Sequence, residues 1–212
     1  KINTIKNNIL YEIIGRGIVL SADTQTCGGN VIINNTINDT ESTAIDISDC
    51  HDLNISLNTI LSPSEEGINV DSSSNLTIEK NIIFNATTYS IYASSLEVSQ
   101  IKHNTLNITQ EESTIYFLNG KNNTLYNNTI KGSAFEGLDI SEGSTGNNIT
   151  FNTIMNSSYD AISIIDSDNN TLSNLDLINS NWSGIYIQNS SGNVFMDSNL
   201  SNNDLATDKG DI

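Results

Sequence analysis

The sequence is poor in proline, tryptophan, cysteine and positive charge. It has one Pro, one Trp, two Cys, and 8 Lys plus Arg against 25 Asp plus Glu. The formal net charge of −17 argues against nucleic acid as a partner, because neutralising phosphates requires clusters of Lys and Arg. No apolar run reaches the roughly 18 residues of a membrane span, and no signal peptide is recognisable. The charge favours cationic surfaces, polyamines or divalent metal ions instead.

The two cysteines, Cys27 and Cys50, suggest a single disulfide. An Asn-rich chain of this kind is typical of the extracellular space, where disulfides persist. Cys27 lies in a segment near residues 21–29 that interrupts an otherwise regular repeat, so a bond would tie that loop to the following coil. The alternative is that the two residues are unpaired and simply small.

What the sequence has in abundance is a repeat based on Asn-Thr-Ile. Copies or near-copies end at Ile37, Ile60, Ile83, Leu106, Ile130, Ile154, Leu177 and Leu200. Successive steps between these residues are 23, 23, 23, 24, 24, 23 and 23, and only the step of 32 from Ile5 to Ile37 departs from the period. A period this regular indicates a repeat architecture.

Other apolar residues recur at fixed offsets from this reference column. Five residues earlier stand Ile32, Ile55, Ile78, Ile101, Leu125, Ile149, Leu172 and Phe195. Pairs such as Ile45-x-Ile47 and Ile185-x-Ile187 alternate as in a strand with one buried face. The pattern predicts an all-β, single-stranded parallel β-helix of about nine coils of 23–24 residues, with three short strands per coil. The crossover rule predicts a right-handed winding.

We expect one continuous domain over residues 1–212, with a loop insertion near 21–29. Because the chain begins partway through a repeat, we expect a segment of a longer chain. The Asn of each repeat is predicted to sit at a bend and to stack on its copies, donating to one coil and accepting from another. This structural ladder comprises Asn35, Asn58, Asn81, Asn104, Asn128 and Asn152.

The repeat resembles those of a known superfamily. The pattern Asn58-Thr59-Ile60 followed by Gly67-Ile68-Asn69-Val70 is similar to the parallel β-helix repeats of the pectin-lyase-like superfamily. Within it, the chain is most similar to the NosD-like and adhesin-like surface proteins of methanogenic archaea. The resemblance covers nearly the whole chain and implies the fold rather than an activity. Such repeats serve lyases, epimerases, copper-assembly proteins, adhesins and sheath components alike.

In enzymes of that superfamily the substrate groove usually follows the outer face of stacked strands. The outward residues between the paired apolar positions include Asp46, Asn69, Tyr92, Tyr116, Asp139 and Tyr186. Tyr beside Asp and Asn suits stacking on sugar rings combined with hydrogen bonds to hydroxyls. The alternative is that they are ordinary exposed cross-strand pairs.

No catalytic cluster is recognisable in the sequence. Asp46 and Asp139 are predicted to stand four coils apart, about 19 Å, which is too far for the paired carboxylates of a glycoside hydrolase. Arg16 lies in the irregular first coil, and His51 and His103 fall at different corners. We therefore expect a protein that is not an enzyme.

An acidic column offers a candidate metal site. Glu112, Glu136 and Asp160 are predicted on consecutive coils about 5 Å apart, where like charges would repel unless a cation such as Ca²⁺ lay between them. The alternative is a solvated, self-repelling corner that prevents aggregation. Beside this column, Phe135, Tyr159 and Trp182 form either a stack that closes the core, which we favour, or an exposed docking strip.

These observations favour a non-catalytic structural or adhesive β-solenoid at the cell surface. It would self-associate end to end or side by side, as a component of an archaeal sheath or S-layer-like envelope. Fourteen Asn-x-Ser/Thr sequons, among them Asn34, Asn54 and Asn107, suggest a glycosylated extracellular surface. The alternative function is a carbohydrate-binding or polysaccharide-modifying protein, lyase-like or epimerase-like, with glycans as partners.

Overall fold

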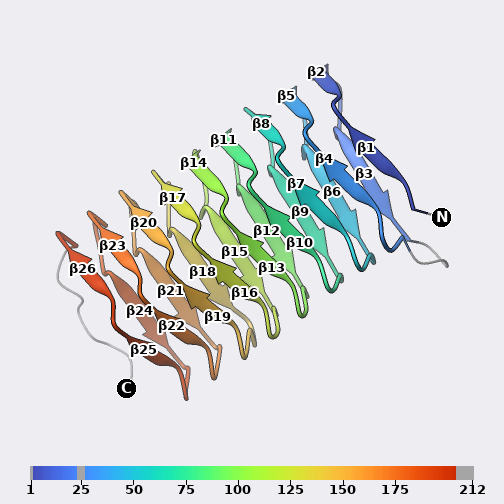
Figure 1. The fold of residues 1–212 in the computed structure, drawn as a ribbon. Coiled ribbons are helices and arrows are strands. Elements are labelled where there is room, and N and C mark those ends of the chain that lie inside the picture. The colour runs from blue at the N-terminus through green and yellow to red at the C-terminus, as the bar shows by residue number, and fades with distance from the viewer. Residues whose placement is uncertain (1, 23–26, 204–212) are drawn as a thin grey trace.

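The computed structural model describes residues 2–22 and 27–203. Within these ranges the chain forms 26 strands and no helix, and it passes through three parallel sheets in turn. Figure 1 shows the coils stacked along one axis, from the N-terminal strands at one end to the C-terminal strands at the other. The predicted all-β parallel β-helix with three short strands per coil is confirmed.

Each sheet collects one strand from every coil. Sheet A contains β1 (Thr4–Lys6), β4 (Val31–Ile33), β7 (Asn54–Ser56), β10 (Thr77–Glu79), β13 (Gln100–Lys102), β16 (Thr124–Tyr126), β19 (Asn148–Thr150), β22 (Thr171–Ser173) and β25 (Val194–Met196). Sheet B contains β2 (Ile9–Ile13), β5 (Thr36–Thr40), β8 (Thr59–Leu61), β11 (Ile82–Ala86), β14 (Thr105–Thr109), β17 (Thr129–Lys131), β20 (Thr153–Met155), β23 (Asp176–Ile178) and β26 (Asn199–Ser201). Sheet C contains β3 (Ile18–Ser21), β6 (Ile45–Ser48), β9 (Ile68–Asp71), β12 (Ile91–Ser94), β15 (Ile115–Leu118), β18 (Leu138–Ser141), β21 (Ile162–Ile165) and β24 (Ile185–Gln188).

The core is a set of stacked aliphatic columns. In sheet B, Ile37 pairs with Ile60 and Ile60 pairs with Ile83, and all three are fully buried. Each of these side chains contributes about 1.5–3 kcal/mol by leaving water. Since the partner of every inner face is the adjacent coil, the coils stabilise one another and none is stable alone.

A buried Asn ladder runs along the corner between sheets A and B. Asn58 donates both its backbone N–H and its side-chain Nδ2 to Oδ1 of Asn81, at 3.0 Å each. The second Nδ2 hydrogen of Asn58 goes to the carbonyl of Ile32 at 3.0 Å. The same bonds repeat from Asn35 to Asn152, and every member is at most 2% exposed. The ladder satisfies backbone groups at a bend, where no sheet partner is available.

The corners between sheets are built from residues with left-handed backbone. Asn34, Asn75 and Asn122 adopt φ values of 54°, as Asn does more readily than most residues. Val98 and Phe151 occupy equivalent corners with φ of 50° and 57°, although larger side chains disfavour this region. The repeated need for left-handed residues accounts for much of the Asn content.

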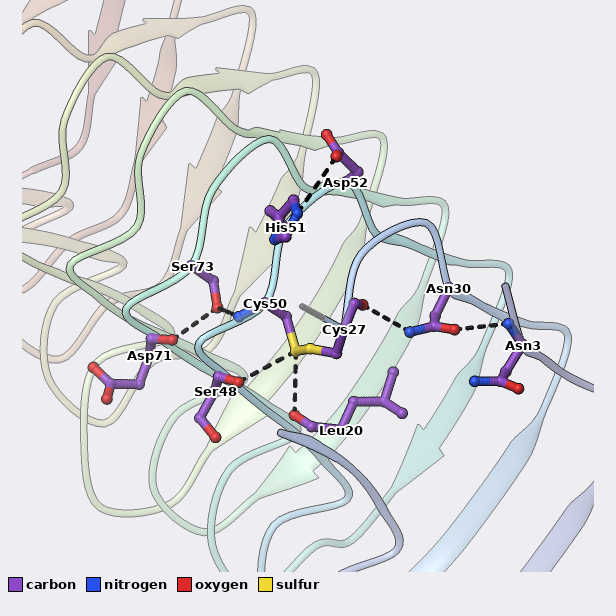
Figure 2. Close-up of a disulfide and its surroundings, with 10 residues drawn as sticks. All are labelled: Asn3, Leu20, Cys27, Asn30, Ser48, Cys50, His51, Asp52, Asp71 and Ser73. Carbon is purple, nitrogen blue, oxygen red and sulfur yellow. Dashed lines mark hydrogen bonds and ion pairs between the residues drawn. A yellow bond between two sulfur atoms is a disulfide. The ribbon is translucent and has the colours of Figure 1, made fainter. Parts of the chain in front are cut away.

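A disulfide joins Cys27 and Cys50, whose Cα atoms are 5.1 Å apart (Figure 2). Cys27 precedes β4 and Cys50 follows β6, so the bond links two consecutive coils. Asn30 anchors the same segment by donating Nδ2 to the Cys27 carbonyl at 2.7 Å (Figure 2). Of the predicted insertion near 21–29, residues 23–26 lie outside the described residues.

In the parts of the chain that the structure describes, no helix is long and apolar enough to cross a membrane. The extent of the domain, residues 1–212, and its membership of a longer chain stay predictions.

Candidate functional site

The outer face of sheet C brings three of the predicted glycan-face residues together. Tyr92 on β12 pairs in register with Tyr116 on β15, and Tyr116 pairs with Asp139 on β18. The inward neighbours of these residues, such as Ile91 and Ile115, are fully buried, so the strand pleat directs the three polar side chains outward. The result is two aromatic rings and a carboxylate on adjacent strands.

A third tyrosine, Tyr89, completes this group. Its ring stacks on Tyr116 with centroids 5.5 Å apart and planes inclined by 17°. Tyr92 lies 5.3 Å from Tyr89 and 5.5 Å from Tyr116, tilted to both. We call Tyr89, Tyr92 and Tyr116 the tyrosine cluster; its members are each partly exposed.

Sequence reasoning missed Tyr89, because it lies at the bend that precedes the strand. The alternation of inward and outward residues holds within β12 but not across that bend, where Ser90 is fully buried. The available signal was the spacing Tyr89-Ser90-Ile91-Tyr92.

Asp139 has the environment of a proton-transfer group. Burial raises its pKa to about 6, and the charges of Glu136 and Glu112 act in the same direction. Ser141 opposes the shift by donating its hydroxyl to Oδ1 of Asp139 at 2.5 Å. A carboxyl group with a pKa near 6 exists in both protonation states close to neutral pH, so it can both give and accept a proton.

The tyrosines keep their phenolic protons at physiological pH. Burial raises the pKa of Tyr116 to about 12, reinforced by the charges of Asp139 and Glu142. Burial likewise raises the pKa of Tyr92, with Asp71, Glu66 and Glu142 adding to the effect. The pKa of Tyr89 also rises through burial and the charge of Glu112. All three hydroxyls can therefore donate hydrogen bonds to a ligand.

Of the remaining predicted face residues, Asn69 on β9 pairs in register with Tyr92 and lies beside this group, whereas Asp46 and Tyr186 lie apart from it. Asp46 on β6 is nearly buried, accepting from Arg16 Nη1 at 2.6 Å and from Asn69 Nδ2 at 2.7 Å. Both oxygens of the Asp46 carboxylate are therefore already hydrogen-bonded to other side chains of the protein. Tyr186 on β24 is separated from Asp139 by the strand of Ser163, and its hydroxyl donates to Gln188 at 3.2 Å.

The three carboxylates predicted as an acidic column, Glu112, Glu136 and Asp160, do not form a single row. In the register of sheet C, Glu136 and Asp160 both stand two residues before the paired Leu138 and Ile162, whereas Glu112 stands three before Ile115. The cause is that Ile115 follows Leu106 by nine positions, whereas their register partners, Leu138 and Ile130, are only eight positions apart.

The carboxylates of this column also have partners inside the protein. Glu136 Oε2 accepts from the Ser113 hydroxyl at 2.8 Å, and Asp160 Oδ1 accepts from the Ser183 N–H at 2.7 Å. Within residues 2–22 and 27–203, no three His, Cys, Asp or Glu side chains are grouped so as to hold a metal ion. The calcium site stays a prediction that this geometry does not support.

Phe135, Tyr159 and Trp182 stack at the corner between sheets B and C. Their centroids are 4.7 and 5.0 Å apart, and Phe135 and Trp182 are 38% and 58% exposed. Our preferred interpretation, a stack that closes the core, is wrong, because the rings lie outside the buried columns.

A hollow of about 450 Å³ near Glu12, Asp39 and Glu41 lies in the first coils and contains no aromatic side chain.

Fold and site together define a three-sided parallel β-helix that carries an aromatic and acidic patch on the outer face of one sheet. The chain belongs to the family described as the right handed beta helix region, whose model matches residues 1–111 and 100–210. No curated protein sequence matches this chain.

Solved structures with the same fold act on polysaccharides. The periplasmic alginate epimerase AlgG is 20% identical with a TM-score of 0.70, over 84% of this chain and 40% of that one. The A-module of the mannuronan C-5 epimerase AlgE6 of Azotobacter vinelandii is 14% identical with a TM-score of 0.77, over 94% and 58%. The catalytic unit of an α-1,3-glucanase from Streptomyces thermodiastaticus is 13% identical with a TM-score of 0.59, over 86% and 45%.

These comparisons correct our expectation that the chain is not an enzyme. The fold is one that polysaccharide-modifying enzymes use, although identities of 13–20% show the fold alone. The chain spans 40–58% of the length of these three relatives. The expectation rested on the lack of a familiar motif, and a motif search does not detect a group such as Asp139, whose pKa depends on burial and on the charges of Glu136 and Glu112.

Proposed function

We propose that the chain is a polysaccharide-binding and polysaccharide-modifying β-helix that holds its glycan on the outer face of sheet C. The observation that carries this proposal is the tyrosine cluster lying directly beside a carboxyl group with a pKa of about 6. Among the two functions considered from the sequence, the polysaccharide-acting alternative is supported better than the structural or adhesive one, since the relatives in hand act on polysaccharides.

The residues divide into two roles. The tyrosine cluster stacks on the apolar faces of sugar rings, and its phenols donate hydrogen bonds to hydroxyl or ring oxygens. Asp139 exchanges a proton with the bound sugar, and the Ser141 hydroxyl holds its Oδ1 in place. Glu112 and Glu136 keep the Asp139 pKa near 6 by their negative charge.

Binding is tested by titrating the chain with a panel of α- and β-linked polysaccharides. Replacing Tyr92→Ala together with Tyr116→Ala is expected to weaken binding at least tenfold, because each stacked aromatic contributes on the order of 1 kcal/mol. Tyr186→Ala is the matched control, since Tyr186 occupies the same outward column but lies apart from the cluster. Equal losses in both variants would count against the cluster as the binding site.

Asp139→Asn separates binding from turnover. The variant is expected to keep affinity within a few-fold while losing about 100-fold or more in glycan conversion, followed by reducing ends or by product spectra. Undiminished conversion by Asp139→Asn would remove Asp139 from the proposal.

An extracellular location and a relation to archaeal surface proteins are part of the proposal. The disulfide between Cys27 and Cys50 supports an oxidising compartment, and one relative is periplasmic. Self-association into a sheath or S-layer-like array and glycosylation of the sequons stay predictions. Electron microscopy of the protein from its source would test the array.

A further inference from the structure

The charges of the described residues are distributed unevenly over the three sheets. Five lysines lie on or directly after strands of sheets A and B or at the corner that leads into sheet A: Lys6, Lys80, Lys102, Lys121 and Lys131. Two of them approach carboxylates there, Lys102 with Glu79 at 3.7 Å and Lys121 with Glu97 at 3.9 Å. None of the five lies on a strand of sheet C.

The one described cation on the side of sheet C is Arg16, and it is already engaged. Its Nη1 donates to Asp46 Oδ2 at 2.6 Å in the first coils, two strands from Tyr92 and three from Tyr116 in the order β6, β9, β12, β15. At about 4.8 Å per strand, these separations are about 10 and 14 Å, both beyond the Debye length of about 8 Å at physiological salt. Arg16 thus offers no counter-charge at the tyrosine cluster.

Negative charge surrounds the tyrosine cluster instead. Asp139 and five further carboxyl groups lie close enough to raise, by their charge, the pKa of a tyrosine of the cluster or of Asp139. The six groups are Glu66, Asp71, Glu112, Glu136, Asp139 and Glu142. They come from three coils, those of β9, β15 and β18, on both sides of the coil of β12, so the negative potential extends along the axis rather than at one point. A bound chain that crosses the cluster lies in this potential over several sugar units.

We infer that this face selects polysaccharides without carboxylate groups and rejects polyuronates. The inference rests on the proposed function and names its substrate class. A sugar unit bearing a carboxylate would place a like charge among the six carboxyl groups with no described cation to neutralise it, and like charges at such distances disfavour binding. An uncharged unit makes the same aromatic contacts and hydrogen bonds without this repulsion. The class therefore differs from the alginate and the mannuronan for which two of the relatives are named.

The test compares each glycan with its own oxidised form. A set of glucans, mannans and galactans is used as such and after oxidation of the primary C6 hydroxyl to a carboxylate, so that linkage and length are matched. At 0.1 M salt we expect each glycan that binds to bind at least tenfold more tightly than its oxidised form. At 1 M salt the gap is expected to shrink to a few-fold, because the Debye length falls to about 3 Å.

A charge variant shows whether these residues cause the selectivity. Asp71→Asn with Glu142→Gln is expected to strengthen binding of the oxidised form severalfold while leaving the parent glycan within about twofold. The matched control, Asp176→Asn with Asp197→Asn, removes the same charge from exposed positions on sheet B and at the corner of sheets A and B, and is expected to keep the gap. Circular dichroism verifies that each variant is folded.

The outcomes separate the two proposals. Oxidised glycans that bind as tightly as their parents, or more tightly, would overturn the inference while leaving the proposed function standing. An equal change in both double variants would also overturn it, since net charge rather than this face would then be responsible. If neither form of any glycan binds the unaltered protein, the proposed function fails, and the inference fails with it.

Discussion

Asp139 is partly buried on the outer face of sheet C. That burial raises its pKa to about 6, whereas an unfolded chain would hold it near 3.9. A carboxyl group with a raised pKa binds more protons in the folded state, so its contribution to stability is complete below about pH 4. The contribution is lost as the pH rises to about 6, where the buried group ionises.

This linkage predicts a pH-dependent effect of Asp139→Asn. Asparagine mimics the protonated acid, so the variant should match the unaltered protein at pH 4. Above pH 6.5 it should be more stable, by on the order of 2 kcal/mol. Thermal unfolding between pH 4 and 8 measures the difference, with Asp176→Asn, an exposed residue of β23, as the control. A constant difference across this range would show that Asp139 is not titrating near pH 6.

At the scale of the strand and its corner, the Asn ladder replaces the hydrogen bonds that a sheet would supply. Asn104 Oδ1 accepts from Asn81 N at 2.9 Å and Nδ2 at 3.1 Å. Asn104 Nδ2 donates to the Ile78 carbonyl at 2.9 Å and to Asn128 Oδ1 at 3.0 Å. Each residue therefore satisfies groups on the coils before and after its own.

Asn104→Ala is expected to destabilise the protein by about 3 kcal/mol or more, because it leaves several buried groups without partners. Asn107→Ala, three residues later on the outward side of β14, is expected to cost no more than about 0.5 kcal/mol. Chemical denaturation of the two variants measures the contrast. Similar costs at both positions would mean that the ladder contributes little to stability.

The strands and the ladder could be predicted from the sequence, because both depend on a period. Ile37, Ile60 and Ile83 recur at a constant step, and the register that pairs them follows from it. The tyrosine cluster could be predicted only in part. Tyr92 and Tyr116 obey the alternation of a strand, but Tyr89 lies across a bend whose geometry the alternation does not describe.

The wrong placement of Glu112 in the acidic column also results from local geometry that the repeat pattern does not describe. Offsets counted from Leu106 assume that the step from the sheet B core residue to the sheet C core residue is constant, yet Leu106 to Ile115 is one residue longer than Ile130 to Leu138. The left-handed backbone of Val98 and Phe151 could not be predicted from the sequence either, because these residue types do not favour such a conformation. The pKa of Asp139 depends on burial and on Glu112 of the preceding coil, which no local pattern specifies.

At the scale of the whole molecule, each coil contacts only its neighbours, so a local change should have a local effect. The disulfide links Cys27 and Cys50 across 23 residues, and a loop of this length corresponds to about 3 kcal/mol of stabilisation.

Replacing both Cys27→Ala and Cys50→Ala is expected to loosen the first coils and to spare the later ones. Hydrogen exchange should accelerate about 100-fold in β1, β4 and β6 and change less than threefold in β15, β18 and β21. Reduction of the unaltered protein provides a second comparison with no change of side chain. Acceleration spread evenly over all coils would contradict the nearest-neighbour picture.

The Asn ladder also makes the rod vectorial. From Asn35 to Asn152, amide oxygens face the preceding coil, and the inter-amide N–H groups face the following one. Their dipoles therefore add along the axis instead of alternating as they do between strands. At this corner, the coil that follows must present an oxygen, and the coil that precedes must present an N–H group. Between Asn35 and Asn152 all coils must consequently run in the same direction, because reversing one of them would set donor against donor at this corner.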